Sequence, residues 1–223
     1  MENNQNTREN NTRIAKNTLM LYARMLLLMV ISLYTSRVIL DTLGIGDYGI
    51  NNVVAGVITM LSFITGSMSS AVTRFLTVAI GEGDPENSKK IFGSLLLIQV
   101  ILAAIIVVFG ETFGLWFVMN KLVIPENRMV AAMWVYQFSI LSSVIGVLMV
   151  PYNAAIIAHE KMKAFAYISI LDAVLKLVIV YMLVISPIDK LITYAILFFC
   201  ISCVDQIIYL TYCAKNFNET RTY

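Results

Sequence analysis

Residues 165–185, FAYISILDAVLKLVIVYMLVI, and residues 191–212, LITYAILFFCISCVDQIIYLTY, are two long apolar stretches joined by the short polar segment SPIDK. Each stretch has about the 20 residues that an α-helix needs to cross the hydrocarbon core of a bilayer. The pair therefore predicts two antiparallel transmembrane helices, and the rest of the chain repeats the same pattern.

The composition supports a membrane protein throughout. Of 223 residues, 59% are hydrophobic and only 13% are charged, whereas soluble domains carry about 25% charged residues. A water-soluble fold of this length cannot bury so much apolar surface, so a bilayer is the expected solvent. The formal net charge of +2 is too small to indicate nucleic-acid binding.

Six apolar stretches have spanning length, and we expect an all-α integral membrane protein with six transmembrane helices. A polar segment, residues 1–16, precedes them, and a short tail, residues 215–223, follows a transmembrane region of residues 17–214. Short connections are expected at residues 41–47, 119–128 and 186–190. The expected spans are residues 17–40, 48–80, 91–118, 129–151, 165–185 and 191–212.

The basic residues predict the orientation, because positive side chains accumulate on the cytoplasmic side. With the N-terminus in the cytoplasm, eleven basic residues lie at cytoplasmic ends and four at outer ends. The four at the outer ends are Arg37, Lys121, Arg128 and Lys190. Both termini are therefore expected in the cytoplasm.

Three ionisable residues, Asp172, Lys176 and Asp205, fall well inside the expected spans, and Arg24 lies one to two turns inside the first span. Each costs about 3 kcal/mol at the centre of a lipid-facing helix, so they should face one another, the bundle interior or water. At about 1.5 Å per residue, Arg24, Asp172 and Asp205 lie at similar depth, roughly 10 Å from the cytoplasmic side. We therefore expect a mixed-charge cluster in a cavity. The alternative is that Asp172 and Lys176, one helical turn apart, form a structural ion pair that only holds helices together.

Other features carry weaker signals. Arg74 lies near the cytoplasmic end of the second span. Two roles are equally compatible with this position, that of an interfacial anchor and that of a ligand-binding residue. Cys200 and Cys203 have CxxC spacing but no second cysteine pair, so packing is expected rather than a metal site. The small polar run of residues 65–70 lines either an aqueous path or a helix contact. No enzyme or nucleotide-binding motif occurs, so no catalytic residue and no cofactor are expected.

Several segments resemble polysaccharide flippases of the Wzx type, in the multidrug/oligosaccharidyl-lipid/polysaccharide exporter superfamily. RVILDTLG at residues 37–44, DYGI at 47–50 and GEGD at 81–84 are similar to the turns around the second helix of that family. Residues 111–116, 124–126 and 134–137 are similar to its third and fourth helices, and PYNA at 151–154 with AHE at 158–160 to the passage into the fifth.

The resemblance implies a two-lobe transporter, with this chain similar to the N-terminal lobe of a MATE-like fold. It implies transport of an oligosaccharide on undecaprenyl diphosphate across the bacterial inner membrane, for O-antigen, capsule or exopolysaccharide synthesis. Arg24, Arg74 and Lys176 would then bind the anionic diphosphate or sugar, and Asp172 and Asp205 would couple transport to H⁺ or Na⁺. Implied partners are membrane lipids, a C-terminal lobe, and a polymerase or glycosyltransferases.

Family members are about twice this length, so the chain is expected to need a second lobe for alternating access. Three alternatives remain. A cation-coupled drug exporter of the same superfamily predicts an acidic, aromatic cavity. A membrane enzyme acting on polyprenyl-phosphate sugars predicts acids or histidines at the membrane face, which are missing here. A truncated, non-transporting membrane fragment predicts no substrate handling.

Overall fold

The computed structural model describes the backbone of residues 2–187 and 189–220, and the side chains of this range except residues 2–17, 20 and 61–64. The described chain consists of helices joined by short connections, without a strand. The long helices are α1 (Glu2–Gly81), α2 (Pro85–Phe109), α4 (Met129–Ala158), α5 (Met162–Ile185) and α6 (Lys190–Asn216). The short elements are η1 (Gly110–Gly114), α3 (Leu115–Asn120), η2 (Glu126–Arg128) and η3 (Asn218–Thr220).

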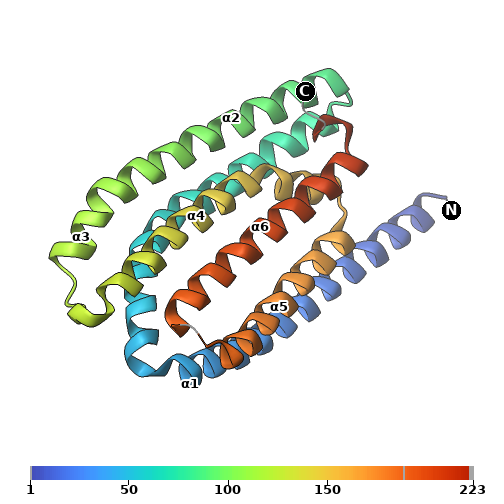
Figure 1. Cartoon of the computed structure of the whole chain (residues 1–223). Coiled ribbons are helices and arrows are strands. Elements are labelled where there is room, and N and C mark those ends of the chain that lie inside the picture. Colours follow the sequence, from blue (N-terminus) through green and yellow to red (C-terminus); the bar gives the residue numbers. More distant parts are fainter. Residues whose placement is uncertain (1, 188, 221–223) are drawn as a thin grey trace.

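Helix α1 has 80 residues and reverses direction near its middle. Straight, it would be about 120 Å long, far more than the roughly 30 Å of a bilayer core. Gly44 has non-helical backbone angles, φ 79° and ψ 165°, in a region that glycine enters without the steric cost other residues have. We call residues 2–43 the first arm and residues 45–81 the second arm; Figure 1 shows them on the two sides of this turn.

The chain is a multi-pass membrane protein with five helices long and apolar enough to cross a bilayer within its described part. Both arms of α1 fall partly within one of these five, Leu21–Met60. Large apolar side chains face outward, as on α2, where Leu97 is 61% and Val108 is 64% exposed. Acyl chains are the environment in which such a surface is stable.

Several helix ends differ from the sequence-based expectation. The connection expected at residues 41–47 is almost absent, since only Gly44 leaves helical conformation. The fourth helix does not end at Pro151 but continues to Ala158. Proline removes one backbone hydrogen bond, but membrane helices tolerate this where neighbouring helices pack closely, and Pro151 and Tyr152 are buried.

Helix α2, which corresponds to the third expected span, begins at Pro85 rather than at residue 91, because its N-terminus is capped. The side chain of Asp84 accepts hydrogen bonds from the backbone N–H of Glu86, at 2.9 Å, and of Asn87, at 3.2 Å. Pro85 then occupies the first helical turn, where its fixed φ angle suits helix initiation.

The third expected span also contains a π-turn, η1 at Gly110–Gly114, which joins α2 to α3. The buried hydroxyl of Tyr136 on α4 donates to the carbonyl oxygen of Gly110 at 2.5 Å. A Cβ atom at Gly114 would collide with the same hydroxyl, so only glycine permits this approach. Gln137 donates to Glu111 at 3.3 Å beside it, and the extra residue of the π-turn is thus held by α4.

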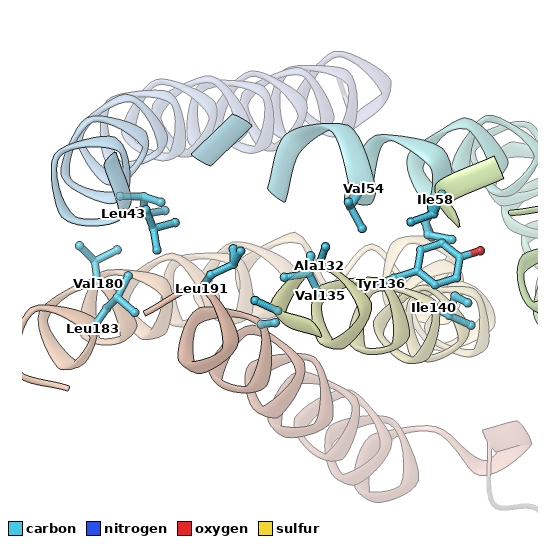
Figure 2. Packing of buried hydrophobic residues seen from close by; sticks show 14 residues of the cluster. Leu43, Val54, Ile58, Ala132, Val135, Tyr136, Ile140, Val180, Leu183 and Leu191 are labelled. Atoms are coloured by element: carbon cyan, nitrogen blue, oxygen red, sulfur yellow. The ribbon is translucent and has the colours of Figure 1, made fainter. Parts of the chain in front are cut away.

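Two apolar clusters hold the bundle at different levels. The first packs the second arm of α1 on α4 through Val54, Ile58, Val135 and Tyr136, and it continues to α5 and α6. Figure 2 also shows Leu43 of α1 opposite Val180 and Leu183 of α5. The second cluster joins residues toward the other ends of these helices, among them Leu76, Phe92, Tyr152, Ile168, Cys213 and Phe217.

Arg128 connects three separate turns at one end of the bundle, here called the Gly44 end. Its Nε donates to Asp47 Oδ1 at 2.8 Å, its Nη2 also pairs with Asp47, and its Nη1 pairs with Asp189. Lys190 Nζ also lies 3.4 Å from the carbonyl oxygen of Thr42. The turn at Gly44, the α3–α4 connection and the α5–α6 connection are therefore at the same level.

The opposite end, here called the Gly83 end, contains residues 82–84 and 159–161 and is fastened by other contacts. The ring of His159 stacks on Phe217, with centroids 4.2 Å apart, and its Nε2 pairs with Glu219. Ser88 Oγ donates to the carbonyl oxygen of Ala79 at 3.0 Å, which ties the start of α2 to the end of α1.

Replacement of Arg128 by alanine should destabilise the protein by about 2 kcal/mol, because two partly buried carboxylates lose their partner. Thermal unfolding in detergent, followed by size-exclusion chromatography, measures the effect. Lys121→Ala, in the same connection, is the matched control, since Lys121 is exposed and its Nζ lies 5.7 Å from the ring centroid of Trp116. Equal stability of the two variants would show that the contacts of Arg128 with Asp47 and Asp189 do not stabilise the protein.

We further predict six crossings, with each arm of α1 spanning the bilayer once. Cysteines introduced at Gly46 and Asn127 should react with an impermeant maleimide from one side, and cysteines at Glu86 and Lys163 only from the other. A Cβ atom at Gly46 meets no atom within 4 Å, and the other positions are exposed. Reaction of positions 46 and 86 from the same side would show that the second arm does not cross.

Candidate functional site

The site begins with an ion pair on α5. Lys176 Nζ lies 2.8 Å from Asp172 Oδ2, and the side chains are 38% and 27% exposed. The two residues are four positions apart, which places them on one face of the helix. The Nζ atom also lies 5.8 Å from the ring centroid of Phe198 on α6, a distance at which the ring face attracts a cation.

Helix α6 adds a second carboxylate to this pair. Asp205 is only 8% exposed, and its carboxyl group lies within hydrogen-bonding reach of Asp172 and within electrostatic range of Lys176. Tyr209, one turn further along α6, is buried and lies within electrostatic range of both carboxylates. The structure thus brings Asp172, Lys176 and Asp205 together from two antiparallel helices.

The first arm of α1 contributes Arg24. Its Nη1 donates to Ser169 Oγ at 3.1 Å, and its guanidinium lies 4.2 Å from the ring centroid of Phe165. Arg24 is also within electrostatic range of Tyr209. It therefore borders the cluster without an ion pair to a described residue, and we call Arg24, Asp172, Lys176, Asp205 and Tyr209 the charged cluster.

Both carboxylates of the charged cluster have an unused oxygen. Asp172 Oδ1 and Asp205 Oδ1 are buried and accept no hydrogen bond from a described residue. Each unsatisfied buried acceptor costs about 1–3 kcal/mol. Two such oxygens at neighbouring carboxyl groups form a place where one proton or one small cation would remove the cost for both.

A cavity of about 360 Å³ reaches this cluster from the first arm of α1. Asp172 and Lys176 line it on one side, and Ser32, Thr35 and Ser36 line it on the other. The hydroxyl of Thr35 is buried without a hydrogen-bond partner among the described residues. We call this space the charged cavity, because it combines one lysine and one aspartate with hydroxyl groups.

A second cavity, of about 440 Å³, lies between the second arm of α1, α4 and α6. Among its lining residues are Thr65 of the small polar run and three serines of α4: Ser139, Ser142 and Ser143. With Gly146 they form a helical face at intervals of three and four residues. The spacing of these serines is visible in the sequence, but a polar helical face was not predicted there.

Arg74 is not brought to the charged cluster. It is exposed near the end of the second arm, and no ion pair of Arg74 occurs among the described residues. Cys200, Cys203 and Cys213 are free thiols, and no group of histidine, cysteine or acidic side chains suited to a metal occurs in the described part of the chain. Arg128, which ties the connections together, was expected only as an interfacial basic residue.

The chain was compared with known proteins at three levels. No protein-family model, no curated protein and no solved structure matches it. The chemistry of the charged cluster and of its two cavities is therefore the basis for the functional inference.

The proximity of the two carboxylates predicts a cross-link. With the three native cysteines replaced by alanine, Asp172→Cys combined with Asp205→Cys should be joined by a short bifunctional maleimide, which shifts mobility after cleavage of the intervening connection. The matched control combines Asp172→Cys with Val204→Cys, since Val204 is 41% exposed on the neighbouring face of α6. Equal cross-linking of both pairs would disprove this arrangement.

Proposed function

We propose that this chain is one six-helix lobe of a flippase that moves oligosaccharides on undecaprenyl diphosphate from the inner to the outer leaflet of a bacterial inner membrane. The observation that carries the proposal is the charged cavity, which Lys176 and Asp172 line within the helix bundle. Charged groups at membrane depth are costly, so their position beside an accessible space favours a role in handling a substrate or ion.

The charges suit a diphosphate when one carboxylate is neutralised. Arg24 and Lys176 balance Asp172 and Asp205 when all four are ionised, and the cluster is then neutral. Uptake of a single proton or Na⁺ by the carboxylate pair leaves one positive charge in excess. Lys176 is then less strongly held by Asp172, and its ammonium group is available to an anionic phosphate in the charged cavity.

This charge balance couples the binding of a cation to the binding of the substrate. A cation bound between Asp172 and Asp205 strengthens substrate binding, and a bound diphosphate strengthens cation binding by the same factor. Loss of the cation restores the Asp172–Lys176 pair and favours release of the diphosphate. No other cofactor is needed, because flipping a lipid-linked sugar breaks no covalent bond.

Alternating access requires two bodies that move around a shared site. In the proposal the described bundle supplies one body and a second lobe supplies the other, with both termini of this chain in the cytoplasm. Glycosyltransferases would supply the lipid-linked sugar on the cytoplasmic side, and a polymerase would consume it outside. Arg74 would act as an interfacial residue rather than in the cavity.

A cation-coupled drug exporter is the second candidate. Two carboxylates beside the aromatic rings of Tyr194 and Phe198 are also a suitable site for an amphipathic cation. The two functions differ in the sign of the preferred ligand charge. Binding measurements with the whole chain therefore separate them.

Lys176→Gln should weaken binding of undecaprenyl diphosphate N-acetylglucosamine by about 10- to 150-fold, because a charge-assisted hydrogen bond to phosphate contributes about 1.5–3 kcal/mol. Lys176→Arg should keep most of the affinity. Binding is measured on the full chain in nanodiscs by native mass spectrometry. Arg37→Gln is the matched control, since Arg37 is an exposed basic residue on the same arm as Arg24.

The outcomes distinguish the candidates. Equal binding by Lys176→Gln and Arg37→Gln would refute a role for Lys176 in holding the diphosphate. Tight binding of ethidium, lost in Asp205→Asn, together with no binding of the lipid-linked sugar, would support the drug exporter. Flipping by the chain in proteoliposomes should require addition of the second lobe.

A further inference from the structure

The second cavity occupies the middle of the bundle, between the two apolar clusters. Val135 and Ile140 of α4 belong to the first cluster, and Tyr152 belongs to the second. Ser142, Ser143 and Gly146 lie between them in the chain and line the cavity. Apolar packing holds the helices at both levels, and Val147 of α4 packs on Ala103 and Ile106 of α2 between them. The small polar residues of α4 face the cavity instead.

The lining of this cavity combines apolar side chains with neutral polar ones. Neutral polar side chains come from the second arm of α1, from α4 and from α6, and they include Asn51, Thr59, Ser139, Ser142, Ser143 and Ser202. Among the described residues that line it, none carries a formal charge. We call it the neutral cavity, to distinguish it from the charged cavity.

Several of its hydroxyls have unused hydrogen-bonding capacity. Thr59 Oγ1 and Ser202 Oγ each donate to a carbonyl of their own helix, at 2.9 Å and 3.2 Å, and keep lone pairs that can accept. Within the described chain, no hydrogen bond engages the side chains of Ser139, Ser142 and Ser143. An acyl chain here would leave these hydroxyls unsatisfied, at about 1–3 kcal/mol each.

Aromatic rings complete the lining. Phe138, Tyr194 and Phe198 border the neutral cavity, and the rings of Tyr194 and Phe198 have centroids 6.0 Å apart. A ring offers an apolar face, and neighbouring hydroxyls offer donors and acceptors. This combination matches a sugar, whose C–H groups are apolar and whose hydroxyls both donate and accept. The volume of about 440 Å³ is in the range of small-molecule pockets, roughly 300–1,000 Å³.

Tyr194 and Phe198 line both cavities and therefore separate them. Lys176, on the charged side, lies 5.8 Å from the ring centroid of Phe198. A ligand with an anionic part beside Lys176 and a neutral part among the serines would lie across these two shared rings. The two cavities are adjacent and chemically different.

We propose that the neutral cavity binds an uncharged sugar ring of the substrate, while the charged cavity binds its diphosphate, with Tyr194 and Phe198 as the partition. The inference rests on the proposed function, and it adds that sugar and diphosphate are recognised in separate places. Ser139, Ser142 and Ser143 are then specificity-determining residues for the sugar.

The test uses the full chain in nanodiscs, with its native cysteines replaced by alanine and one new cysteine in each cavity. Ser142→Cys reports on the neutral cavity and Ser32→Cys on the charged cavity, and both are small, nearly isosteric changes. The probes are undecaprenyl diphosphate and undecaprenyl diphosphate N-acetylglucosamine. The measured quantity is the rate of reaction with a small maleimide.

We expect the sugar-free lipid to slow labelling at position 32 only, and the sugar-bearing lipid to slow it at both positions. At ten times the dissociation constant each protection should be about tenfold. Leu141→Cys is the matched control next to Ser142. Leu141 is 45% exposed on the outside of α4, where acyl chains suppress the thiolate that reacts, so its slow labelling should not change.

The outcomes separate this inference from the proposed function. Protection at position 32 but not 142 by the sugar-bearing lipid would overturn the inference and leave the flippase proposal standing. Equal protection at 142 by both lipids would also overturn it, since the cavity would not be selecting the sugar. Protection at neither position by either lipid would overturn both proposals.

Discussion

The contacts of Arg128 with Asp47 and Asp189 set the common level from which the bundle is built. They hold the turn at Gly44, the α3–α4 connection and the α5–α6 connection at one end. Helices that leave from the same level place residues at equal distances along the chain at equal depth. Asp172 and Asp205 meet because the two helices that carry them are joined by a short connection at this end.

A bilayer makes opposite demands on the two sides of each helix. The outside must be apolar over its full height, and on α2 large side chains such as Leu97 and Val108 satisfy this. The inside is packed with apolar side chains near the two ends, in the clusters around Val135 and Tyr152, and also between α2 and α4 through Ala103, Ile106 and Val147. The middle contains the hydroxyls and charges that a lipid-facing surface could not carry, and both cavities open there.

The sequence was sufficient for the fold class, the apolar stretches and the meeting of Asp172, Lys176 and Asp205, because hydropathy and depth along a helix are properties of the chain alone. It was insufficient for Arg128 and for the serines of α4, because their roles depend on which helix faces which. The expectation that the fourth helix ends at Pro151 was wrong for a related reason. Close packing around Pro151, rather than its backbone, decides that the helix continues to Ala158. Arg74 lies at a depth that would suit a cavity residue, but it is on the second arm of α1, the arm away from α5. Depth alone does not distinguish residues of the first arm from residues of the second arm.

The π-turn at Gly110–Gly114 inserts one residue into an otherwise regular helix. Because successive residues of an α-helix are rotated by about 100° around its axis, everything beyond the turn is rotated by that amount relative to an uninterrupted helix. Loss of a single codon from this segment would therefore spare the helix but turn Trp116 and the rest of α3 to a different side. Evolution of this chain can accept substitutions on either side of the turn far more easily than a change of length within it.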